Sequence, residues 1–338
     1  MLRGVSFALV LVIVLGVAGG YYYWRTIAGL FQRTNVNLSE AVGGAMNIVI
    51  VGSDSRAGLT DPEDFHRFGA PAGRRSDTLI LAQIIPSQQR GVLLSIPRDL
   101  WVTVHHGPGR FEGKINSAYN YGAQSVIDTV YALTGVPINH YIEVNFAGFQ
   151  KMVDAIGGID VCNQRSFYDY IIGFGLKAGP HHLGGLEALQ YVRTRHATAD
   201  GDFGRIKRQQ EFLRAVMSKV GRPSVLGNPL RVNRLATAFA QNVTVDQFFK
   251  LPDLVRLAVS LRRVGQNQLE TYSLPGRIGN VAGQSVVFVN QTQSEPLFTA
   301  LREVKDPRGL MAQTSSPAPT SPGRRPAAPS AAPSACPA

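Results

Sequence analysis

The sequence predicts a mixed α/β fold, in which a central mixed β-sheet is flanked by helices, preceded by one N-terminal transmembrane helix. Three observations support this: short runs rich in Val and Ile, longer helical patterns interspersed among them, and an uncharged stretch near the N-terminus. Short β-branched runs that end at turn residues are typical of buried strands. Because strands and helices do not alternate strictly, we expect an α+β sandwich rather than a repeated βαβ fold.

The first element is the run 46–51, which ends at Gly52 and indicates a buried strand. Residues 78–85 and 91–96 have the same composition, and the short segment 86–90 predicts a hairpin-like connection between them. The remaining predicted elements are helices at 121–134, 146–156, 184–192, 203–220, 246–262 and 292–304, and strands at 139–145, 158–162, 267–273 and 284–289.

The N-terminal stretch from Val5 to Trp24 contains no charged residue. About 20 helical residues cover the roughly 30 Å of a bilayer core, and the aromatic residues 21–24 suit the membrane interface. We therefore predict a transmembrane signal-anchor at 5–24, preceded by a cytoplasmic N-terminus at 1–4. The alternative is a cleaved signal peptide, since small residues at 18–20 suit a signal peptidase. In both cases the rest of the chain is exported.

The domain boundaries follow from composition. Residues 25–45 suggest a short polar linker, 46–305 one folded domain, and 306–338 a disordered tail rich in Pro, Ala and Ser. The two cysteines, Cys162 and Cys336, match no zinc or redox spacing. Outside the cell they are able to form a disulfide, and the alternative is two unpaired or intermolecular thiols.

The net charge of +11 favours polyanionic partners such as nucleic acid, anionic lipid or phosphorylated glycans. The predicted anchor and the absence of a helix-turn-helix or zinc signature argue against nucleic acid. No G-x-S-x-G, P-loop, H-E-x-x-H or G-x-G-x-x-G motif occurs, which removes the commonest hydrolase, NTPase, zincin and dinucleotide sites. The adjacent pairs His105-His106 and His181-His182 suggest surface histidines rather than metal ligands.

Acidic and basic residues gather at the ends of the first three predicted strands. Asp54 follows the first strand, Asp77 stands at the start of the second, and Arg98 and Asp99 follow the third. If the strands are neighbours, these groups converge at one sheet edge. Mg²⁺ accepts carboxylate and phosphate oxygens, which suits Asp54 and Asp77, while arginine binds phosphate bidentately. Salt bridges and turn caps are the alternative, but the surplus of arginine favours a phosphate ligand.

Further arginines follow later in the sequence. Arg193 and Arg195 share a face only if the chain is extended there. Arg205 and Gln209 stand four residues apart, on one side of a helix for which Asp202 is an N-cap candidate.

These segments resemble the motifs of the LytR–CpsA–Psr family, in order, from about residue 46 to 214. The matching segments are Gly52-Ser53-Asp54-Ser55-Arg56, Arg75-Ser76-Asp77-Thr78, Ser95-Ile96-Pro97-Arg98-Asp99, Lys114-Ile115-Asn116-Ser117-Ala118-Tyr119, Leu133-Thr134-Gly135-Val136-Pro137-Ile138-Asn139-His140-Tyr141, Asp154-Ala155-Ile156-Gly157-Gly158-Ile159, Tyr191-Val192-Arg193-Thr194-Arg195, Asp202-Phe203-Gly204-Arg205 and Arg208-Gln209-Gln210. The stretch 58–74 departs from the pattern and suggests a surface insertion or lid.

The resemblance implies an extracytoplasmic, single-pass membrane enzyme. It would transfer a glycopolymer from a polyprenyl-pyrophosphate carrier to peptidoglycan, with Mg²⁺ as cofactor and Mn²⁺ as the alternative ion. Asp54 and Asp77 would hold the metal. The residues that would bind the pyrophosphate are Arg56, Arg75, Arg98, Arg193, Arg195, Arg205 and Gln209. The catalytic set would be Asp77, Arg75, Arg98, Asp99, Arg193 and Arg195.

Within that set, Asp99 is the candidate for accepting the hydroxyl proton. The partners expected are the lipid-linked glycan, peptidoglycan and the lipid membrane, with no nucleic acid. The alternative functions are a polyprenyl-(pyro)phosphate binding protein and a pyrophosphatase without ligase activity.

Overall fold

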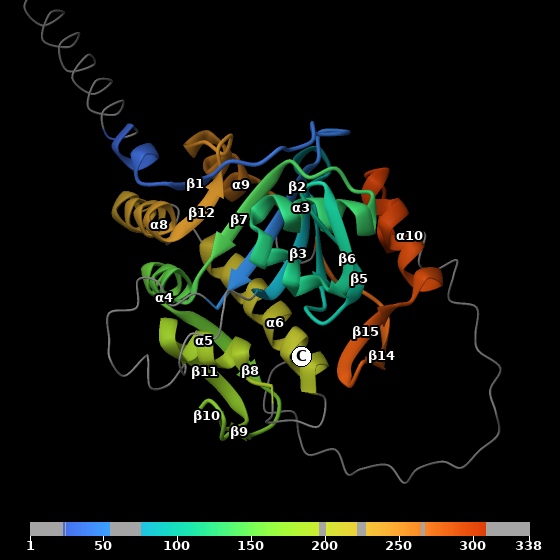
Figure 1. Cartoon of the computed structure of the whole chain (residues 1–338). Helices are drawn as coiled ribbons and strands as arrows, with labels where there is room; N and C mark the ends of the chain where they lie inside the picture. Colours follow the sequence, from blue (N-terminus) through green and yellow to red (C-terminus); the bar gives the residue numbers. More distant parts are fainter. Residues whose placement is uncertain are drawn as a thin grey trace, which may run out of the picture.

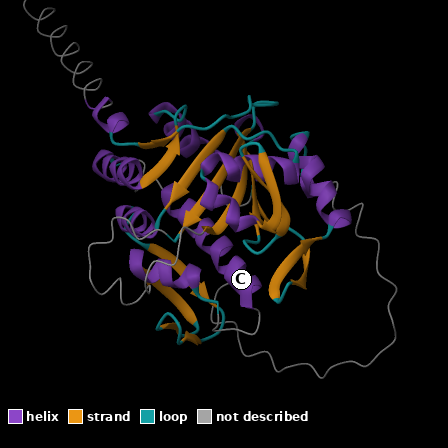
Figure 2. Cartoon of the chain, in the orientation of Figure 1, coloured by secondary structure: helices purple, strands orange, loops and turns teal. Residues whose placement is uncertain are grey.

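The computed structural model describes residue 23 and residues 25–54, 76–195, 201–221, 228–264 and 268–308. Within these ranges a few side chains, among them those of Asp77, Asp202 and Phe203, are outside the description. A central sheet is covered by helices on both faces (Figures 1 and 2). The predicted mixed fold is therefore confirmed.

The sheet has seven strands in the order β1-β12-β7-β2-β3-β4-β13. Their bounds are β1 Gln32–Thr34, β2 Met46–Ser53, β3 Ser76–Ile85, β4 Arg90–Ile96, β7 His140–Val144, β12 Val243–Asp246 and β13 Leu269–Ser273. β2, β3 and β4 pair antiparallel, whereas β7 runs parallel to β2 and β13 parallel to β4. The 3₁₀ turn Pro86–Gln88 makes the predicted hairpin connection between β3 and β4.

The central strands are mostly apolar on both faces because both sheet faces are covered. Along β2, Val49 and Val51 enter one apolar cluster while Ile48 enters another on the opposite face. The first cluster includes residues of η2 Ile115–Tyr121, α3 Ala123–Thr134 and α10 Gln291–Arg302. The second includes residues of α8 Pro229–Asn242 and α9 Leu251–Val264, with α6 Gly201–Gly221 packed against it.

A third cluster lies below the sheet in Figure 1 and joins α4 Phe146–Ala155 and α5 Gly185–Arg193 to α6. Four two-stranded antiparallel sheets complete the described chain. They are β5 Trp101–His106 with β6 Gly109–Lys114, β8 Ile159–Asn163 with β11 Gly179–Leu183, β9 Phe167–Asp169 with β10 Phe174–Leu176, and β14 Gly276–Val281 with β15 Gln284–Val289. Several of these short strands and α8 were not predicted from the sequence.

The segment 25–45, predicted as a polar linker, is part of the folded domain. Ile27 and Phe31 are buried, and β1 pairs with β12 at the edge of the sheet. The helix predicted at 246–262 begins only at Leu251. The reason is that Asp246 ends β12 and its Oδ1 accepts the N–H groups of Phe248 and Phe249, which turns the chain before the helix begins.

Two expectations fall on residues outside the description. Among the described residues, no helix is long and apolar enough to cross a bilayer, and of the predicted span 5–24 only Tyr23 is described. Cys162 is disulfide-bonded, and the chain's only other cysteine, Cys336, lies in the tail outside the described residues.

Candidate functional site

The predicted meeting of three strand ends is confirmed by the sheet register. Ser53, at the end of β2, pairs with Ser76 at the start of β3, and Leu79 of β3 pairs with Ile96 at the end of β4. Because the three strands are antiparallel neighbours, Asp54 and Arg98 follow strand ends at the same sheet edge. We call this the site edge.

A glycine at this edge allows two strands and a helix to meet. Gly52 faces Thr78, and a Cβ added to Gly52 would lie 3.1 Å from the Thr78 Cβ. Thr78 Oγ1 accepts a 3.0 Å hydrogen bond from Gln209 Nε2 of α6, which also donates to the Val192 carbonyl of α5 at 3.4 Å. Gln209 therefore ties both helices to the start of β3, as well as being a predicted ligand of the pyrophosphate.

Arg193 and Arg195 lie on either side of a helix end. Arg193 is the last residue of α5, and Thr194 leaves the helical conformation with ψ 123°. The Arg193 guanidinium lies over the ring of Phe146 at 4.5 Å from its centroid. Phe146 starts α4, which is capped by Asn145 through a 2.7 Å bond from the Gly148 N–H. A cation–π contact of this kind orients a guanidinium without neutralising it.

Arg195 is positioned by a buried aspartate that the sequence analysis missed. Asp169 of β9 is fully buried; its Oδ2 accepts the Arg195 N–H at 2.9 Å and its Oδ1 accepts the Ile171 N–H at 3.1 Å. No motif marks Asp169, because its importance depends on a contact across 26 residues.

Two more guanidinium groups come from α6. Arg205 and Arg208 are 7% and 8% exposed, so both are buried one turn apart on the helix. Arg208 donates to the carbonyl of Thr194 and lies over the ring of Phe167 at 5.6 Å. Arg205 was predicted as a site residue; Arg208 was not. We call Arg193, Arg195, Arg205 and Arg208 the arginine cluster.

Tyr191 and Glu211 link helices α5 and α6 by a side-chain hydrogen bond. The Tyr191 hydroxyl donates a 2.8 Å hydrogen bond to Glu211 Oε2. Burial, followed by the nearby Glu211 carboxylate, raises the pKa of Tyr191 well above its usual range. Tyr191 is therefore neutral at physiological pH and acts as a hydrogen-bond donor.

Asp99, the candidate for accepting the hydroxyl proton, is ion-paired in this structure. Lys114 Nζ lies 3.0 Å from Asp99 Oδ1, and Arg98 Nε lies 3.6 Å from Asp99 Oδ2. Asp99 thus orients two cations at the end of β4. Lys114, which opens the Lys114–Tyr119 segment, is a further cation that the sequence analysis did not assign to the site.

A second carboxylate near the edge is also engaged. Glu143 of β7 is in register with Val51 of β2. Its Oε1 accepts the hydroxyl of Tyr119, and its Oε2 accepts that of Tyr141 at 3.0 Å. Tyr119, the last residue of the Lys114–Tyr119 segment, is therefore a hydrogen-bond donor to the half-buried carboxylate of Glu143.

The predicted metal site is described only in part. Asp54 follows β2 and Asp77 lies in the adjacent strand β3, so their backbones share the site edge. The side chain of Asp77 and the whole of Arg56 and Arg75 lie outside the described residues. Within the described part of the chain no group of three His, Cys, Asp or Glu side chains is arranged to hold a metal.

Comparison with known proteins agrees with the sequence motifs. The model of the LytR_cpsA_psr family matches residues 27–303. A "probable cell wall biosynthesis protein LcpB" of Corynebacterium glutamicum is 36% identical over 264 residues, which cover 76% of this chain and 61% of the relative. This chain thus spans about three fifths of that protein's length.

A second relative is the "polyisoprenyl-teichoic acid–peptidoglycan teichoic acid transferase TagU" of Halalkalibacterium halodurans. It is 36% identical over 254 residues, covering 74% of this chain and 77% of the relative. Among solved structures, a "LytR-Csp2A-Psr enzyme" from Actinomyces oris superposes with a TM-score of 0.65 at 24% identity, covering 82% of this chain and 97% of that one. The fold, the ordered motifs and the match across residues 27–303 show that this chain belongs to the LytR_cpsA_psr family.

Proposed function

We propose that this protein is a phosphotransferase that moves a glycopolymer from a polyprenyl-pyrophosphate carrier onto peptidoglycan during cell-wall assembly. The observation that carries the proposal is the arginine cluster on α5, on the turn after it and on α6, since Gln209 of α6 is hydrogen-bonded both to Val192 of α5 and to Thr78 at the start of β3. Four arginines on these adjoining segments suit a diphosphate, which carries several negative charges and accepts bidentate hydrogen bonds.

The way the cluster is held supports this proposal. The Arg195 backbone is fixed by Asp169, Arg193 lies on Phe146, and Arg208 bonds a backbone carbonyl. Donors fixed before the substrate arrives stabilise charge in the transition state without reorganisation. This preorganisation favours catalysis over simple electrostatic attraction.

The donor set also suits a divalent metal. Asp54 and Asp77, from neighbouring strands, would supply the carboxylate oxygens that Mg²⁺, or Mn²⁺, prefers together with phosphate oxygens. When bound, such an ion would neutralise charge on the diphosphate. The fit rests on the chemistry and strand position of the two residues.

In the proposed reaction, a peptidoglycan sugar hydroxyl attacks the phosphorus on the glycan side of the diphosphate. A new phosphorus–oxygen bond forms, the bond to the polyprenyl phosphate breaks, and the hydroxyl proton passes to solvent. The leaving polyprenyl phosphate carries the displaced negative charge, which the arginine cluster stabilises. The product is a phosphodiester between glycopolymer and peptidoglycan.

The relatives support the same class of reaction, since one carries the name of a teichoic acid transferase acting on peptidoglycan. For this chain we propose a single-pass membrane protein with the catalytic domain outside the cytoplasm. The apolar stretch 5–24 would supply the span.

The test is to incubate the full chain with a synthetic glycosyl pyrophosphoryl polyprenol and peptidoglycan oligomers, with and without Mg²⁺. The Asp77→Ala variant is run beside it, with Glu112→Ala on the exposed β5–β6 hairpin as the matched control. A Mg²⁺-dependent phosphodiester product, lost only with Asp77→Ala, supports the proposal.

Two other outcomes would replace the proposal. Release of polyprenyl phosphate without joined product indicates a pyrophosphatase. Retention of the prenol without either product indicates a binding protein.

A further inference from the structure

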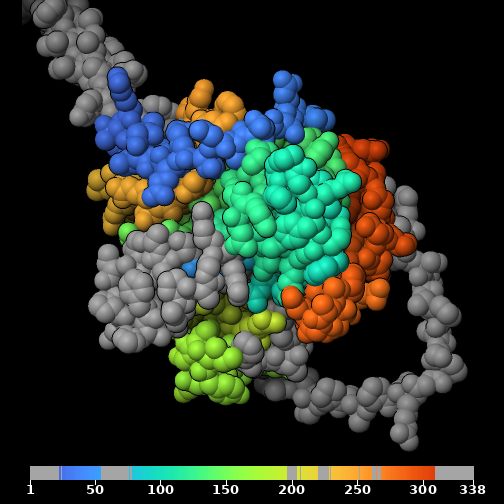
Figure 3. Space-filling view, in the orientation of Figure 1, coloured from blue at the N-terminus to red at the C-terminus, as the bar shows by residue number. Residues whose placement is uncertain are grey.

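Exposed apolar side chains are concentrated on α8, on α9 and on the turn before α9, on either side of the N-terminal segment (Figure 3). Of the thirteen large apolar side chains exposed in the described part of the chain, six belong to Tyr23 or to residues 228–264. We call this surface the α8–α9 face. Its apolar members are Tyr23, Leu230, Val232, Phe248, Val255 and Val259, with exposures from 38% to 70%.

Helix α9 shows why this face is unusual. Its inner positions Leu254 and Leu257 pack on the second apolar cluster. The outer stripe of the same helix carries Val255 and Val259, exposed at 48% and 43%, with Arg256 between them. A helix facing only water normally places polar residues on its outer stripe, and a concentration of exposed apolar groups indicates a binding surface.

The charges on this face are basic. Arg231, Arg234, Lys250 and Arg256 are exposed. The described segment 228–264 has two acidic residues: Asp246 is fully buried, and Asp253, whose side chain is 15% exposed, forms an ion pair with Arg256 at 3.1 Å. Apolar side chains interleaved with exposed cations fit an anionic lipid surface, where the cations meet headgroup phosphates.

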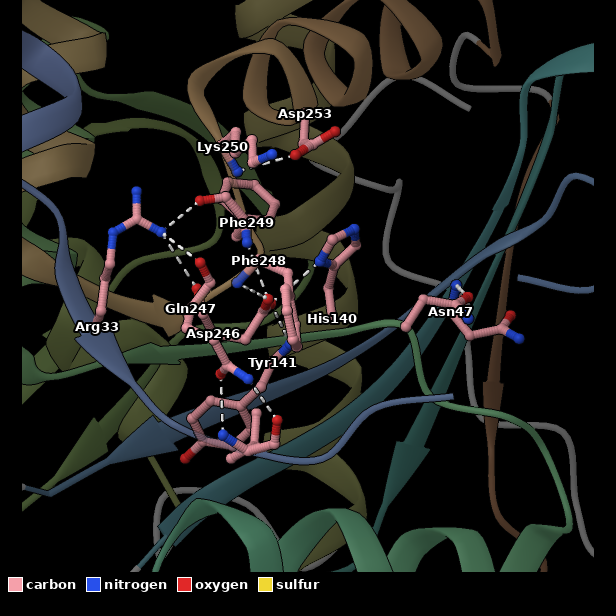
Figure 4. Close-up of polar contacts among 12 residues, drawn as sticks. Arg33, Asn47, His140, Tyr141, Asp246, Gln247, Phe248, Phe249, Lys250 and Asp253 are labelled. Atoms are coloured by element: carbon pink, nitrogen blue, oxygen red, sulfur yellow. Dashed lines mark hydrogen bonds and ion pairs between the residues drawn. The ribbon is translucent and has the colours of Figure 1, made fainter. Parts of the chain in front are cut away.

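The N-terminal residues are fixed to the same face. Arg33 Nη1 donates to the carbonyls of Gln247 at 3.2 Å and Phe249 at 2.7 Å (Figure 4). The backbone of Val36 exchanges two hydrogen bonds with the Gln247 side chain, at 2.9 and 2.6 Å. We call Arg33, Val36, Asp246 and Gln247 the brace.

The brace sets where the chain enters the domain. The Tyr23 hydroxyl donates to Asn233 Oδ1 of α8, so the first described residue lies against this face. In Figure 3 the N-terminal segment (blue) lies between two orange regions of the surface. The predicted apolar span 5–24 therefore joins the domain at the α8–α9 face rather than at the site edge.

The turn 246–250 of the α8–α9 face and the site lie at opposite ends of the central strands. His140 begins β7 and contacts Asp246 of the brace at 3.0 Å, while Val144 ends β7 beside Gly52 at the site edge. β2 runs between the same two ends from Met46 to Ser53, a rise of about 23 Å. A membrane under the brace would thus hold the arginine cluster above the lipid headgroups.

We propose that the α8–α9 face rests on an anionic lipid leaflet beside the predicted span, so that the domain has one fixed orientation on the membrane. The exposed apolar side chains enter the boundary between headgroups and acyl chains, and the four cations bind lipid phosphates. A basic residue near an anionic membrane surface contributes about fivefold to the equilibrium constant for docking. This inference does not depend on the transferase activity.

The experiment places a spin label on the full chain in nanodiscs of phosphatidylglycerol and phosphatidylcholine. Labels are attached at Phe248→Cys and Val255→Cys, and at Ile278→Cys on β14 as the control, a position 68% exposed away from this face. We expect the first two labels to lose contact with a water-soluble relaxation agent and gain contact with oxygen dissolved in the lipid. The control label should stay in water.

The charge component is tested with Arg231→Gln, Arg234→Gln, Lys250→Gln and Arg256→Gln combined. The matched control removes four exposed cations elsewhere, at Arg110, Arg165, Lys177 and Lys305. We expect lipid contact to fall in the first variant and in discs of pure phosphatidylcholine, but not in the control variant.

Labels at 248 and 255 that remain as accessible to water as the label at 278 would overturn the proposal. Spin–spin broadening at 255 in discs holding two copies would instead assign the face to a second copy of this chain. Both readouts are independent of glycopolymer transfer, so neither depends on the proposed activity.

Discussion

Two fully buried aspartates, one on each side of the molecule, show how the same residue type serves stability in one place and the site in another. Asp246, at the brace, accepts the N–H groups of Tyr141, Phe248 and Phe249 and contacts His140. Asp169, beside the arginine cluster, accepts the N–H groups of Arg195 and Ile171. Both are fully buried, yet only Asp169 holds a residue of the proposed site.

The arginines differ in the same way. Arg33 donates to backbone carbonyls of the 246–249 turn, and Arg90 donates to those of Val304 and Lys305. Such arginines stabilise chain ends and turns by donating hydrogen bonds to backbone carbonyls. The arginine cluster instead gathers four guanidinium groups around the junction of α5 and α6. The comparison teaches that a buried arginine indicates a ligand site only when several converge.

The largest expected effect on stability is at the brace. Asp246→Ala removes the side-chain acceptor of three N–H groups, those of Tyr141, Phe248 and Phe249, of which Phe249 keeps the Asp246 carbonyl as an acceptor, and each buried N–H group left unsatisfied costs about 1–3 kcal/mol. We expect the free energy of unfolding of the full chain to fall by about 3 kcal/mol or more in urea denaturation. The exposed Glu303→Ala is the control and should leave the midpoint unchanged. Equal urea midpoints for Asp246→Ala and Glu303→Ala would show that Asp246 does not stabilise the fold.

The next effect concerns activity alone. Arg193→Ala and Arg195→Ala each remove a charge that stabilises the leaving phosphate, so we expect transfer to fall about 100-fold or more. The urea midpoint should move little, in contrast to Asp246→Ala. The control is Arg110→Ala at an exposed position of β6. It changes the net charge of the protein by the same amount and should leave transfer at the wild-type rate. Near-wild-type transfer by both site variants would remove the arginine cluster from the mechanism.

A smaller effect sharpens the role of Asp169. Asp169→Asn replaces one carboxylate oxygen with an amide nitrogen, so one of the two N–H groups loses its acceptor. We expect about a tenfold loss of transfer through misplacement of Arg195, since one uncharged hydrogen bond contributes about 1 kcal/mol or somewhat more.

The matched control for Asp169→Asn is Asn163→Ala. Asn163 supports the same hairpin by donating to the carbonyls of Arg165 and Lys177, with no hydrogen bond to Arg195. If both variants lose transfer in proportion to stability, Asp169 is structural only. A larger loss of kcat in Asp169→Asn at equal stability supports positioning of Arg195.

The smallest expected effect is on the free energy of unfolding at alkaline pH. Burial and Glu211 raise the pKa of Tyr191 above its ordinary value of 10.0. A group whose pKa is raised on folding contributes stability that is present below the ordinary value and is lost as pH rises through the folded value. We therefore expect Tyr191→Phe to lose less stability than wild type above about pH 10. The exposed Tyr170→Phe should behave as wild type.

Much of the fold could be predicted because local pattern and tertiary environment agree. The strands at 46–53, 76–85 and 90–96 are rich in Val, Ile and Leu since both sheet faces are buried. Helices such as α3 and α5 lie within a residue or two of their predicted bounds. The segment 25–45 was misjudged because Ile27 and Phe31 are two isolated apolar residues whose burial depends on α8 and α9.

The sequence alone was enough to predict the family, the neighbouring strand ends and the surplus of arginine at the site. The reason is that the order of the motifs and the charge of each segment depend only on which residues are present. The tertiary structure decided which charges are engaged. It paired Asp99 with Lys114, set Asp169 under Arg195 and turned Val255 and Val259 outward. These contacts join residues far apart in the chain or depend on which side of a helix is covered, and no local pattern records either.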